Sequence, residues 1–567
     1  MSLQTLVQKL IDDTVTTSLP AFYPELAICA TIVVLLLVRL FRAGERIDPF
    51  LFALVGSAVA FWVALPEGGF AGLGEVERRE IFTGMLIYDS MTAFFRLFLL
   101  GFAVGFVILV RMTGLADRQD GQDFYTLLLG ATLGMCIMSS ANHLMTIFLG
   151  VEMASVPSFV MAGILKGRRR ASEAALKYAV YGAGAAGVML YGISLLAGLT
   201  GTAHLPSIAA WLTSKNIPGL IATGQEGSTL MVLALAALMI MVGLAFKLSA
   251  VPFHFWCPDV FEGASAEVDA FLSVASKGAA MALLVRVAIG ISAAGEAASA
   301  AGPPTTQHDV PLQTIALVQT ADGEAASAAG QVSQDPLSPV RTFLVRLLAV
   351  VAAVTCTFGN LAAYGQTNIK RLLAYSTIAH AGYMMMAVAA AVQMAGSNAV
   401  GAREAIAALL FYLAVYVFMN TGAFAIVAFV RNAIGSEEIA DYGGLIRSAP
   451  LTSVALTTIL VSLIGLPPLA GFVGKFAVFA ALVDAGGPWM IGLLVIAGVN
   501  TAVSLVYYLR VAKVVCIDPE PDTRGPVSLG VLPAVYVLII SLPVLIYGIL
   551  PGPVLEVARA ASAQLLM

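Results

Sequence analysis

The sequence has little charge for its length. Of 567 residues, 11% are charged and 59% are hydrophobic, whereas an ordinary soluble domain carries about 25% charged residues. One soluble core cannot bury so much apolar sequence. The net charge is only −4, and the chain has no basic tail or aromatic–basic pattern of the kind that follows a phosphate backbone. We therefore exclude a soluble globular class and expect no nucleic acid partner.

Cysteine is also scarce. The five cysteines lie far apart without CxxC spacing, which argues against an iron–sulfur or zinc site; they are Cys29, Cys136, Cys257, Cys356 and Cys516. A literal GxGxxG match at Gly182, Gly184 and Gly187 lies inside an apolar run with no strand before it, so close helix packing explains it better than a dinucleotide site. The N-terminal stretch lacks a basic segment and carries Asp12 and Asp13, so we expect no cleaved signal.

Apolar runs long enough to cross a membrane recur along the chain. A hydrocarbon core about 30 Å thick needs roughly 20 apolar residues per helix, and polar breaks divide the chain into about fourteen such runs. They begin near Ala21, Asp48, Ser90, Phe124, Asn142, Ser172, Leu230, Ser265, Arg341, Lys370, Arg403, Leu451, Pro488 and Leu529. This pattern predicts an all-α, polytopic integral membrane protein.

Basic residues favour one orientation of these spans. If the N-terminus lies outside, sixteen Lys and Arg residues fall in the cytoplasmic connections and at most eight in the outer ones. The positive-inside rule therefore predicts a multi-pass protein with both termini outside, which is the periplasmic side of a bacterial inner membrane.

Charged residues remain inside the predicted spans. Glu152, Lys247, Lys277 and Lys475 lie near the middle of apolar runs. Each central charge costs about 2.5–3.5 kcal/mol on insertion scales, or on the order of 10 kcal/mol together. One glutamate cannot neutralise three lysines, and burial disfavours the charged form of an amine. We therefore expect these residues to load and release protons.

The other polar residues of the spans lie nearer the helix ends than the four central charges, or are residue types that occur buried without a proton-carrying role. Arg96 and Arg286 lie near helix ends, and we expect them to form buried ion pairs or to reach the interface. Lys177 lies nearer the cytoplasmic edge and could do the same or extend the charged row. His254 and His380 titrate near neutrality and could relay protons, although a lone buried histidine is more often merely hydrogen-bonded.

Helix breakers stand beside two of the central lysines. Lys247 precedes Pro252, and Lys475 follows Pro467 and Pro468. Proline removes a backbone donor and frees the carbonyl one turn back. Such broken helices occur at membrane depth where protein or a hydrated cavity satisfies them, so this layout is typical of an ion path.

Several long motifs in the same stretches resemble one family. They are FLGVEMASVPSFVMAG, SEAALKYAVYGA, AFKLSAVPFHFWCPDVFEGA, FLSVASKGAA, NIKRLLAYSTIAHAGYM and LPPLAGFVGKF. Together they resemble subunit N of bacterial NADH–quinone oxidoreductase (respiratory complex I), an antiporter-like membrane subunit. The lysine of GFVGKF, Lys475, looks most like subunit N, because a sister subunit often has glutamate there.

This resemblance implies a detailed fold. It implies fourteen helices with two inverted five-helix repeats, helices 4 to 8 and helices 9 to 13, in which helices 7 and 12 are broken. The corresponding division is 1–120 for the first three helices, 121–292 for the first repeat, 293–340 for a low-complexity outer loop, 341–516 for the second repeat, and 517–567 for the last helix and tail.

The resemblance also implies a function. Proton translocation would be coupled to electron transfer from NADH to quinone in other subunits, which would hold the NADH, FMN, iron–sulfur clusters and quinone, so we expect no cofactor and no redox centre in this chain. Antiporter-like subunit M and small subunits J and K are the expected neighbours. The implied path has a coupling pair, a central carrier, an exit residue and two auxiliary relays: Glu152 and Lys247, Lys277, Lys475, and Lys177 with His254. An Mrp-type cation/proton antiporter or a membrane-bound hydrogenase subunit is the alternative.

The chain departs from the family pattern at the mouth of helix 8. Glu267 and Asp269 stand where GAPxPV usually supplies uncharged residues. They could attract cations there, or they could pair with nearby loop arginines, and we favour the second interpretation. The insertion after helix 8 is a further departure.

Overall fold

The computed structural model describes residues 3–566 except 41–47, 117–120, 216, 224–226, 293–334, 523, 526 and 528. Most of the predicted outer loop, 293–340, therefore lies outside the described residues, and a helix already begins at Ser338.

The first part of the chain consists of a short helical arm followed by three spans. The arm consists of α1 (Leu3–Asp13) and α2 (Leu19–Ala21), joined by a π-helical turn, and the spans are α3 (Tyr23–Leu40), α4 (Pro49–Ala64) and α5 (Ser90–Thr113). A bend of 80° separates the arm from α3. Between α4 and α5 the chain forms a hairpin that the sequence pattern did not predict, with β1 (Arg79–Ile81) antiparallel to β2 (Leu86–Tyr88).

A first group of five spans follows. It comprises α6 (Gly121–Ser140), α7 (Leu144–Ala162), α8 (Arg169–Thr200), the pair α11 (Gly227–Leu248) and α12 (Trp256–Gly263), and the continuous α13 (Ala266–Phe271) and α14 (Lys277–Ser292). The short helices α9 (Leu205–Ser214) and α10 (Ile217–Thr223) connect α8 to α11.

A second group of five spans completes the bundle with a last span and a terminal helix. The group comprises α16 (Ser338–Ala363), α17 (Ile369–Met394), α18 (Ala399–Ile434), the pair α20 (Pro450–Ile464) and α21 (Ala470–Ala485), and α22 (Gly487–Cys516). The short α19 (Leu445–Ser448) precedes α20, and α23 (Val531–Ile549) and α24 (Gly552–Ser562) end the chain.

The prediction of about fourteen spans is confirmed. In the described ranges, 11 helices are long and apolar enough to cross a membrane, and the number rises to 13 when two bent pairs count as single spans. The broken pair α20–α21 completes the set. The fourth span of each group is the broken one, as the resemblance implied.

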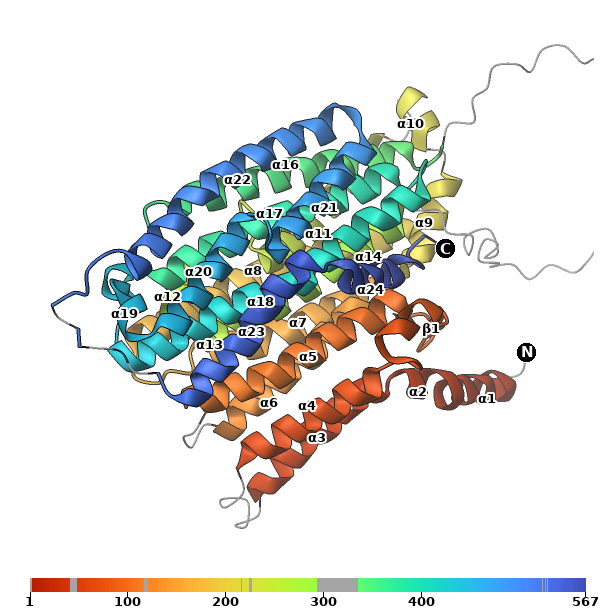
Figure 1. The fold of residues 1–567 in the computed structure, drawn as a ribbon. Helices are drawn as coiled ribbons and strands as arrows, with labels where there is room; N and C mark the ends of the chain where they lie inside the picture. The colour runs from red at the N-terminus through yellow and green to blue at the C-terminus, as the bar shows by residue number, and fades with distance from the viewer. Residues whose placement is uncertain are drawn as a thin grey trace, which may run out of the picture.

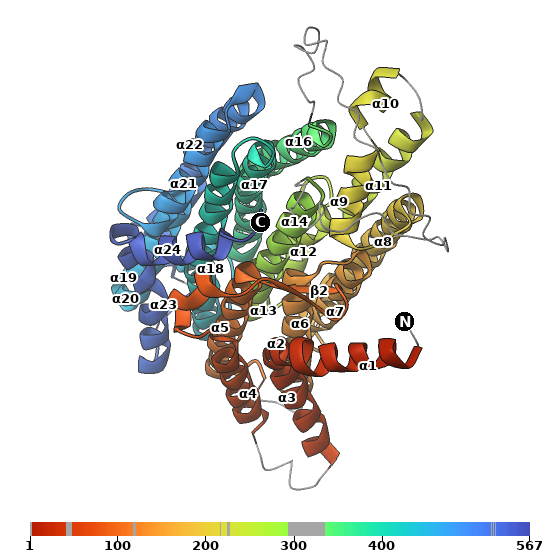
Figure 2. The same cartoon turned by 90° about the vertical axis from the view of Figure 1, so that its right-hand side faces the viewer.

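The two groups of five run in opposite directions. Both chain termini lie at the right-hand end of the bundle (Figure 1), which we call the terminal end. The opposite end carries Arg170 and Arg371 and is called the basic end. The first group begins at the basic end with α6, whereas the second begins at the terminal end with α16 (Figures 1 and 2). The arrangement is therefore inverted, and which end faces the periplasm stays a prediction.

Small residues allow the closest helix contacts. A Cβ added at Gly243 of α11 would lie 2.4 Å from the Met189 sulfur of α8, and one added at Gly182 would lie 2.4 Å from the Phe159 ring. Added Cβ atoms at Gly184 and Gly187 would meet nothing within 4 Å. Close packing therefore explains Gly182 but not the other two glycines of the GxGxxG match.

Burial falls from the centre of the bundle outwards. The helices α17, α18 and α13–α14 are almost wholly buried, whereas α22 and α23 expose apolar side chains along much of their length. Such exposed apolar faces suit contact with lipid. The most deeply buried helices carry Lys277, His380 and Tyr412, which are among the polar residues discussed next.

Candidate functional site

Two of the charged residues inside the spans form buried ion pairs. The Arg96 Nε donates to Glu25 Oε1 at 2.7 Å, and the Arg286 guanidinium bonds both carboxylate oxygens of Asp89. All four side chains are almost fully buried. The expectation that Arg96 and Arg286 form buried ion pairs or reach the interface is met by the first alternative. Removal of either partner would leave an unpaired buried charge.

Lys247 lies where the first broken span ends its helix. It occupies the last turn of α11, is 1% exposed, and its Nζ makes no hydrogen bond to the described residues. The backbone then turns at Ser249 with φ 56°, and the Trp256 indole caps the helix end by donating to the Phe246 carbonyl at 3.1 Å. The break therefore leaves Lys247 buried and without a bound partner in the part of the chain that is described.

Glu152 interacts electrostatically with Lys247 but forms no ion pair with it in the described structure. Glu152 lies on α7 and is half-buried, and it interacts electrostatically with Lys247. Among the described residues, however, no salt bridge joins the two side chains. The two side chains thus lie within electrostatic range of each other without forming a salt bridge in the described structure.

Lys277 begins a helix directly after a π-helical turn. The turn spans Leu272–Ser276, and Lys277 is 3% exposed with no hydrogen bond from its Nζ to the described residues. Turns of this type are frequent at functional sites because they displace one side chain from the regular helical pattern. Lys277 is thus a second buried amine without a partner in the described chain.

Lys475 satisfies the backbone at the second break. Its Nζ donates to the carbonyl oxygens of Leu463 at 3.0 Å and Ile464 at 2.9 Å, at the end of α20. Such terminal carbonyls have no partner inside their own helix. The Nζ also lies 4.5 Å from the centre of the Tyr383 ring. A single lysine therefore links α20, α21 and α17.

His380 is hydrogen-bonded to two tyrosines in the buried part of the bundle. Its Nδ1 shares a 2.6 Å hydrogen bond with the Tyr412 hydroxyl, and its Nε2 lies 3.3 Å from the Tyr508 hydroxyl. The imidazole is buried and lies within Coulombic range of both Lys277 and Lys475. His380 is thus hydrogen-bonded, as buried histidines usually are, and also lies within Coulombic range of two lysines of the row.

Sequence reasoning missed the hydroxyl groups around His380. Tyr412 and Tyr508 bond the imidazole, and the Tyr508 hydroxyl also bonds Ser376. The Tyr383 hydroxyl lies 3.3 Å from Thr501 Oγ1. Tyrosine is common in apolar spans, so a single one carries no signal. Two pairs of tyrosines, Tyr412 with Tyr416 in α18 and Tyr507 with Tyr508 in α22, would have been a better indicator.

His254 lies in the first break, between α11 and α12. It is buried, and its ring contacts Phe358 at a centroid distance of 4.4 Å and Phe255 at 4.3 Å. Its Nδ1 makes no hydrogen bond to the described residues. The structure therefore places His254 near Lys247 along the chain, in a mainly aromatic environment.

Lys177 belongs to a charged cluster at the basic end. Its Nζ pairs with Asp259 at 2.7 Å and Glu173 at 2.9 Å, and Asp259 also bonds Arg371. These side chains line a polar cavity of about 250 Å³. Lys177 thus lies in a salt-bridge network at the bundle edge and apart from the buried amines.

Glu267 and Asp269 lie against cations at the start of helix α13. Glu267 lies 3.7 Å from Arg431, Asp269 lies 4.0 Å from Lys370, and both carboxylates are fully buried. Lys370 also pairs with Glu437 at 2.9 Å. This geometry matches the interpretation that they pair with nearby cations, although a lysine replaces one of the expected arginines.

No metal centre is evident in the ranges that the structure describes. There, no three His, Cys, Asp or Glu side chains gather closely enough to hold a metal ion.

Comparison with known proteins identifies the family. Residues 141–300 and 324–501 match the family described as NADH:quinone oxidoreductase/Mrp antiporter, TM. NADH-quinone oxidoreductase subunit N from Anaeromyxobacter sp. (strain Fw109-5) is 37% identical over 97% of this chain and 98% of its own length. The chain belongs to the NADH-quinone oxidoreductase subunit N family.

Chains of two solved membrane complexes are also similar to this chain. A chain of respiratory complex I from Thermus thermophilus, solved with bound aureothin, is 31% identical, with a TM-score of 0.68 over 94% of this chain and 98% of that one. A chain of the Mrp complex from a Dietzia species gives a TM-score of 0.75 at 18% identity, covering 97% and 98% of the two chains. The second likeness shows the shared fold alone.

Proposed function

We propose that this subunit N family member is a proton-translocating membrane subunit of NADH–quinone oxidoreductase and contains no redox centre of its own. The observation that carries the proposal is a set of three buried lysines, Lys247, Lys277 and Lys475, none of which forms a salt bridge with the described residues. Uncompensated amines are costly inside a membrane and usually mark ion pathways. Two of them adjoin helix breaks, which supports the same reading.

The proposed coupling step is the closing and opening of the Glu152–Lys247 pair. A nearby carboxylate favours the ammonium form of a lysine, and its withdrawal in a dry site favours release of the proton. Conformational change in other subunits would shift the population between these two states. The released proton would move toward Lys277, with His254 as an auxiliary relay.

The second half of the proposed path uses His380. A proton on Lys277 would pass by way of the hydrogen-bonded group of His380, Tyr412 and Tyr508 toward Lys475, which lies in the second break. Hydroxyl and imidazole groups both donate and accept hydrogen bonds, so such a group can pass a proton without moving far. Lys177, in the charged cluster at the basic end, would supply protons to the path.

The remaining features of the proposal concern the assembly. NADH, FMN, iron–sulfur clusters and quinone would be held by other subunits. Antiporter-like subunit M and small subunits J and K would be the neighbours, within a bacterial inner membrane and with the terminal end facing the periplasm.

The test compares buried and exposed lysines in the assembled complex. Lys247→Ala and Lys277→Ala should each lower proton translocation per NADH oxidised at least tenfold in sealed vesicles. Lys215→Ala removes an exposed lysine at the terminal end and should leave the ratio unchanged. If both buried variants kept the wild-type ratio, the proposal would be abandoned. If they lowered only the yield of complex, the chain would be a structural subunit instead.

An autonomous cation/proton antiporter of Mrp type, or a membrane-bound hydrogenase subunit, is the second candidate, because the matching family covers NADH:quinone oxidoreductase and Mrp antiporters together. Reconstitution of the purified chain alone into vesicles with a pH gradient separates these possibilities. Sodium or potassium exchange by the isolated chain would favour the antiporter, and inertness outside a larger assembly favours the complex I subunit.

A further inference from the structure

Arg346 is a cation on the outer surface of a membrane span. It lies eight residues after the start of α16, and its side chain is exposed. In the described part of the chain it takes part in no hydrogen bond or ion pair. An exposed guanidinium on an apolar span is unfavourable unless it reaches the interface or finds an anion.

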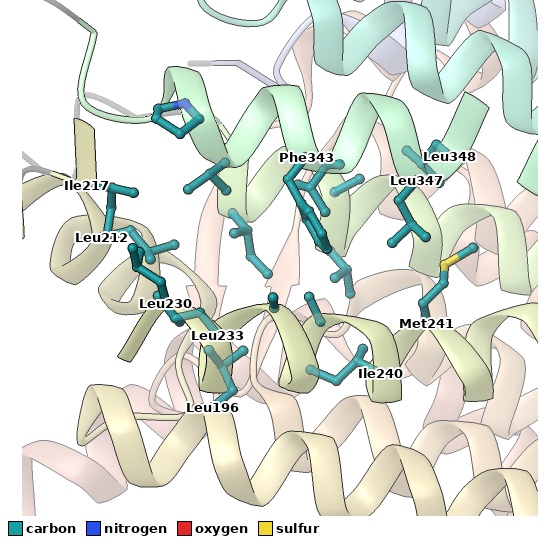
Figure 3. Close-up of a pocket in the computed structure, with 18 of the residues that line it drawn as sticks. Leu196, Leu212, Ile217, Leu230, Leu233, Ile240, Met241, Phe343, Leu347 and Leu348 are labelled. Carbon is teal, nitrogen blue, oxygen red and sulfur yellow. The ribbon is translucent and has the colours of Figure 1, made fainter. Parts of the chain in front are cut away.

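An apolar groove lies on one side of this arginine. It separates α11 from α16, has a volume of about 380 Å³, and is lined entirely by hydrophobic residues, including Ile240 on α11 and Phe343 and Leu347 on α16 (Figure 3). Along α11 the lining runs from Leu230 to Leu244, which is roughly 21 Å at 1.5 Å per residue. One leaflet of the hydrocarbon core is about 15 Å deep. The groove is therefore long enough for an acyl chain.

A second apolar groove lies on the other side. It separates α16 from α22 and has a volume of about 410 Å³. The α16 wall includes Val350 and Ala353, and the α22 wall includes Gly492 and the half-exposed Trp489. Trp489 is close to the start of α22 at the terminal end, and tryptophan is enriched at the level of the lipid headgroups. This groove thus begins near the membrane surface.

Helical spacing places Arg346 next to lining residues of both grooves. It lies three residues after Phe343 of the first groove and four residues before Val350 of the second. Residues three and four apart share one face of a helix. Helical side chains also lean toward the N-terminus of their helix, which for α16 is the terminal end. We therefore expect the guanidinium to reach toward the headgroup region at the terminal end, above lining residues of both grooves.

We propose that α16 carries a bound phospholipid, with its phosphate diester on Arg346 and its acyl chains in the two grooves. A guanidinium and a phosphate form two parallel, charge-assisted hydrogen bonds, so a phosphate is a suitable anion for this arginine. Two grooves that flank one cation fit the two chains and single phosphate of a diacyl phospholipid. A protein carboxylate would satisfy the charge but would leave both grooves unfilled.

The experiment measures lipid retention by the intact membrane assembly that contains this chain. After purification in mild detergent, native mass spectrometry counts the bound phospholipids in the wild type, in Arg346→Gln and in Arg169→Gln. Arg169 is an exposed arginine at the opposite end of the bundle and provides the charge-matched control. Arg346→Gln should weaken retention of one phospholipid about tenfold, and Arg169→Gln should retain it.

A second variant tests whether the second groove holds an acyl chain and leaves Arg346 unchanged. Gly492→Leu places a bulky side chain in the second groove, at a position where an added Cβ meets nothing within 4 Å. It should also release the phospholipid although Arg346 is intact. An unchanged lipid count in Arg346→Gln would overturn the proposal. So would loss of a neighbouring subunit with no loss of lipid, because Arg346 would then bind a protein carboxylate.

Discussion

His380 and Tyr412 are joined by a 2.6 Å hydrogen bond between the imidazole Nδ1 and the phenol hydroxyl, in the middle of the most buried part of the bundle. The contact ties α17 to α18. It also fixes the orientation of the imidazole, since each ring nitrogen faces a different tyrosine. A relay that depends on this orientation should be sensitive to loss of a single hydroxyl.

Tyr412→Phe should therefore slow proton translocation. The substitution removes the hydroxyl that orients His380 while keeping the ring, so we expect a several-fold lower proton-to-electron ratio in vesicles that contain the assembled complex. Tyr416→Phe is the matched control, because the Tyr416 ring lies 5.3 Å from the His380 ring and its hydroxyl makes no hydrogen bond to the described residues. Equal ratios in the two variants would contradict a role for the 2.6 Å bond.

Glu25→Gln should damage assembly and leave coupling intact. The change leaves the buried Arg96 guanidinium without its carboxylate, and breaking a buried ion pair in this way costs about 3–5 kcal/mol. The yield and thermal stability of the complex should fall, whereas the complex that survives should pump normally. The double variant Glu25→Gln with Arg96→Gln should recover part of the stability, since neither charge remains. A normal yield with uncoupled turnover would place this pair in the proton path instead.

Asp269→Val should not destabilise the protein. The Asp269 carboxylate is fully buried, makes no hydrogen bond to the described residues and lies 4.0 Å from Lys370, which keeps its closer partner Glu437 at 2.9 Å. Replacement of a poorly paired buried charge by an apolar residue of similar size is often neutral or stabilising. Glu437→Gln is the contrasting variant and should lower the midpoint of thermal unfolding. The opposite order of the two midpoints would show that Asp269 is the essential partner of Lys370.

The contact between the β-hairpin and α9 should loosen in acid. The hydrogen bond from His204, at 3.1 Å, lowers the pKa of Glu80 below its ordinary value, against the raising effect of partial burial. A carboxyl with a depressed pKa stabilises the folded contact above its unfolded pKa of about 4.3. That stabilisation is lost as the pH falls through the lower, folded pKa.

Hydrogen exchange of the hairpin measures this loss. Protection of the β1–β2 amides relative to Glu80→Gln should be greatest near neutral pH, should start to fall near about pH 4.3 and should disappear below the lower, folded pKa. Asn142, which also bonds Glu80, retains its bond to the Gly84 carbonyl in the variant and keeps the hairpin folded. A constant difference in protection across the pH range would argue against titration of Glu80.

The sequence alone predicted the spans and the buried charges well, for a physical reason. A charge such as Lys277 in an apolar run is conspicuous because its insertion is costly, and prolines mark both broken helices. The partners of these residues were not predictable, because they depend on how distant helices meet. Lys370, for example, pairs with Asp269 of α13 and with Glu437 of the connection after α18. The hairpin was missed because its three-residue strands are too short for an alternating pattern.

The hydrogen bonds from Lys475 to the end of α20 can persist in both protonation states of the lysine. An ammonium has three N–H groups, and a neutral amine keeps two of them, so either form can donate to the carbonyls of Leu463 and Ile464. An ionised glutamate at the same position could donate to neither. Lys475 can therefore lose and regain a proton while its amine still donates to the carbonyls at the end of α20. Repeated protonation then requires no rearrangement of the backbone at this break.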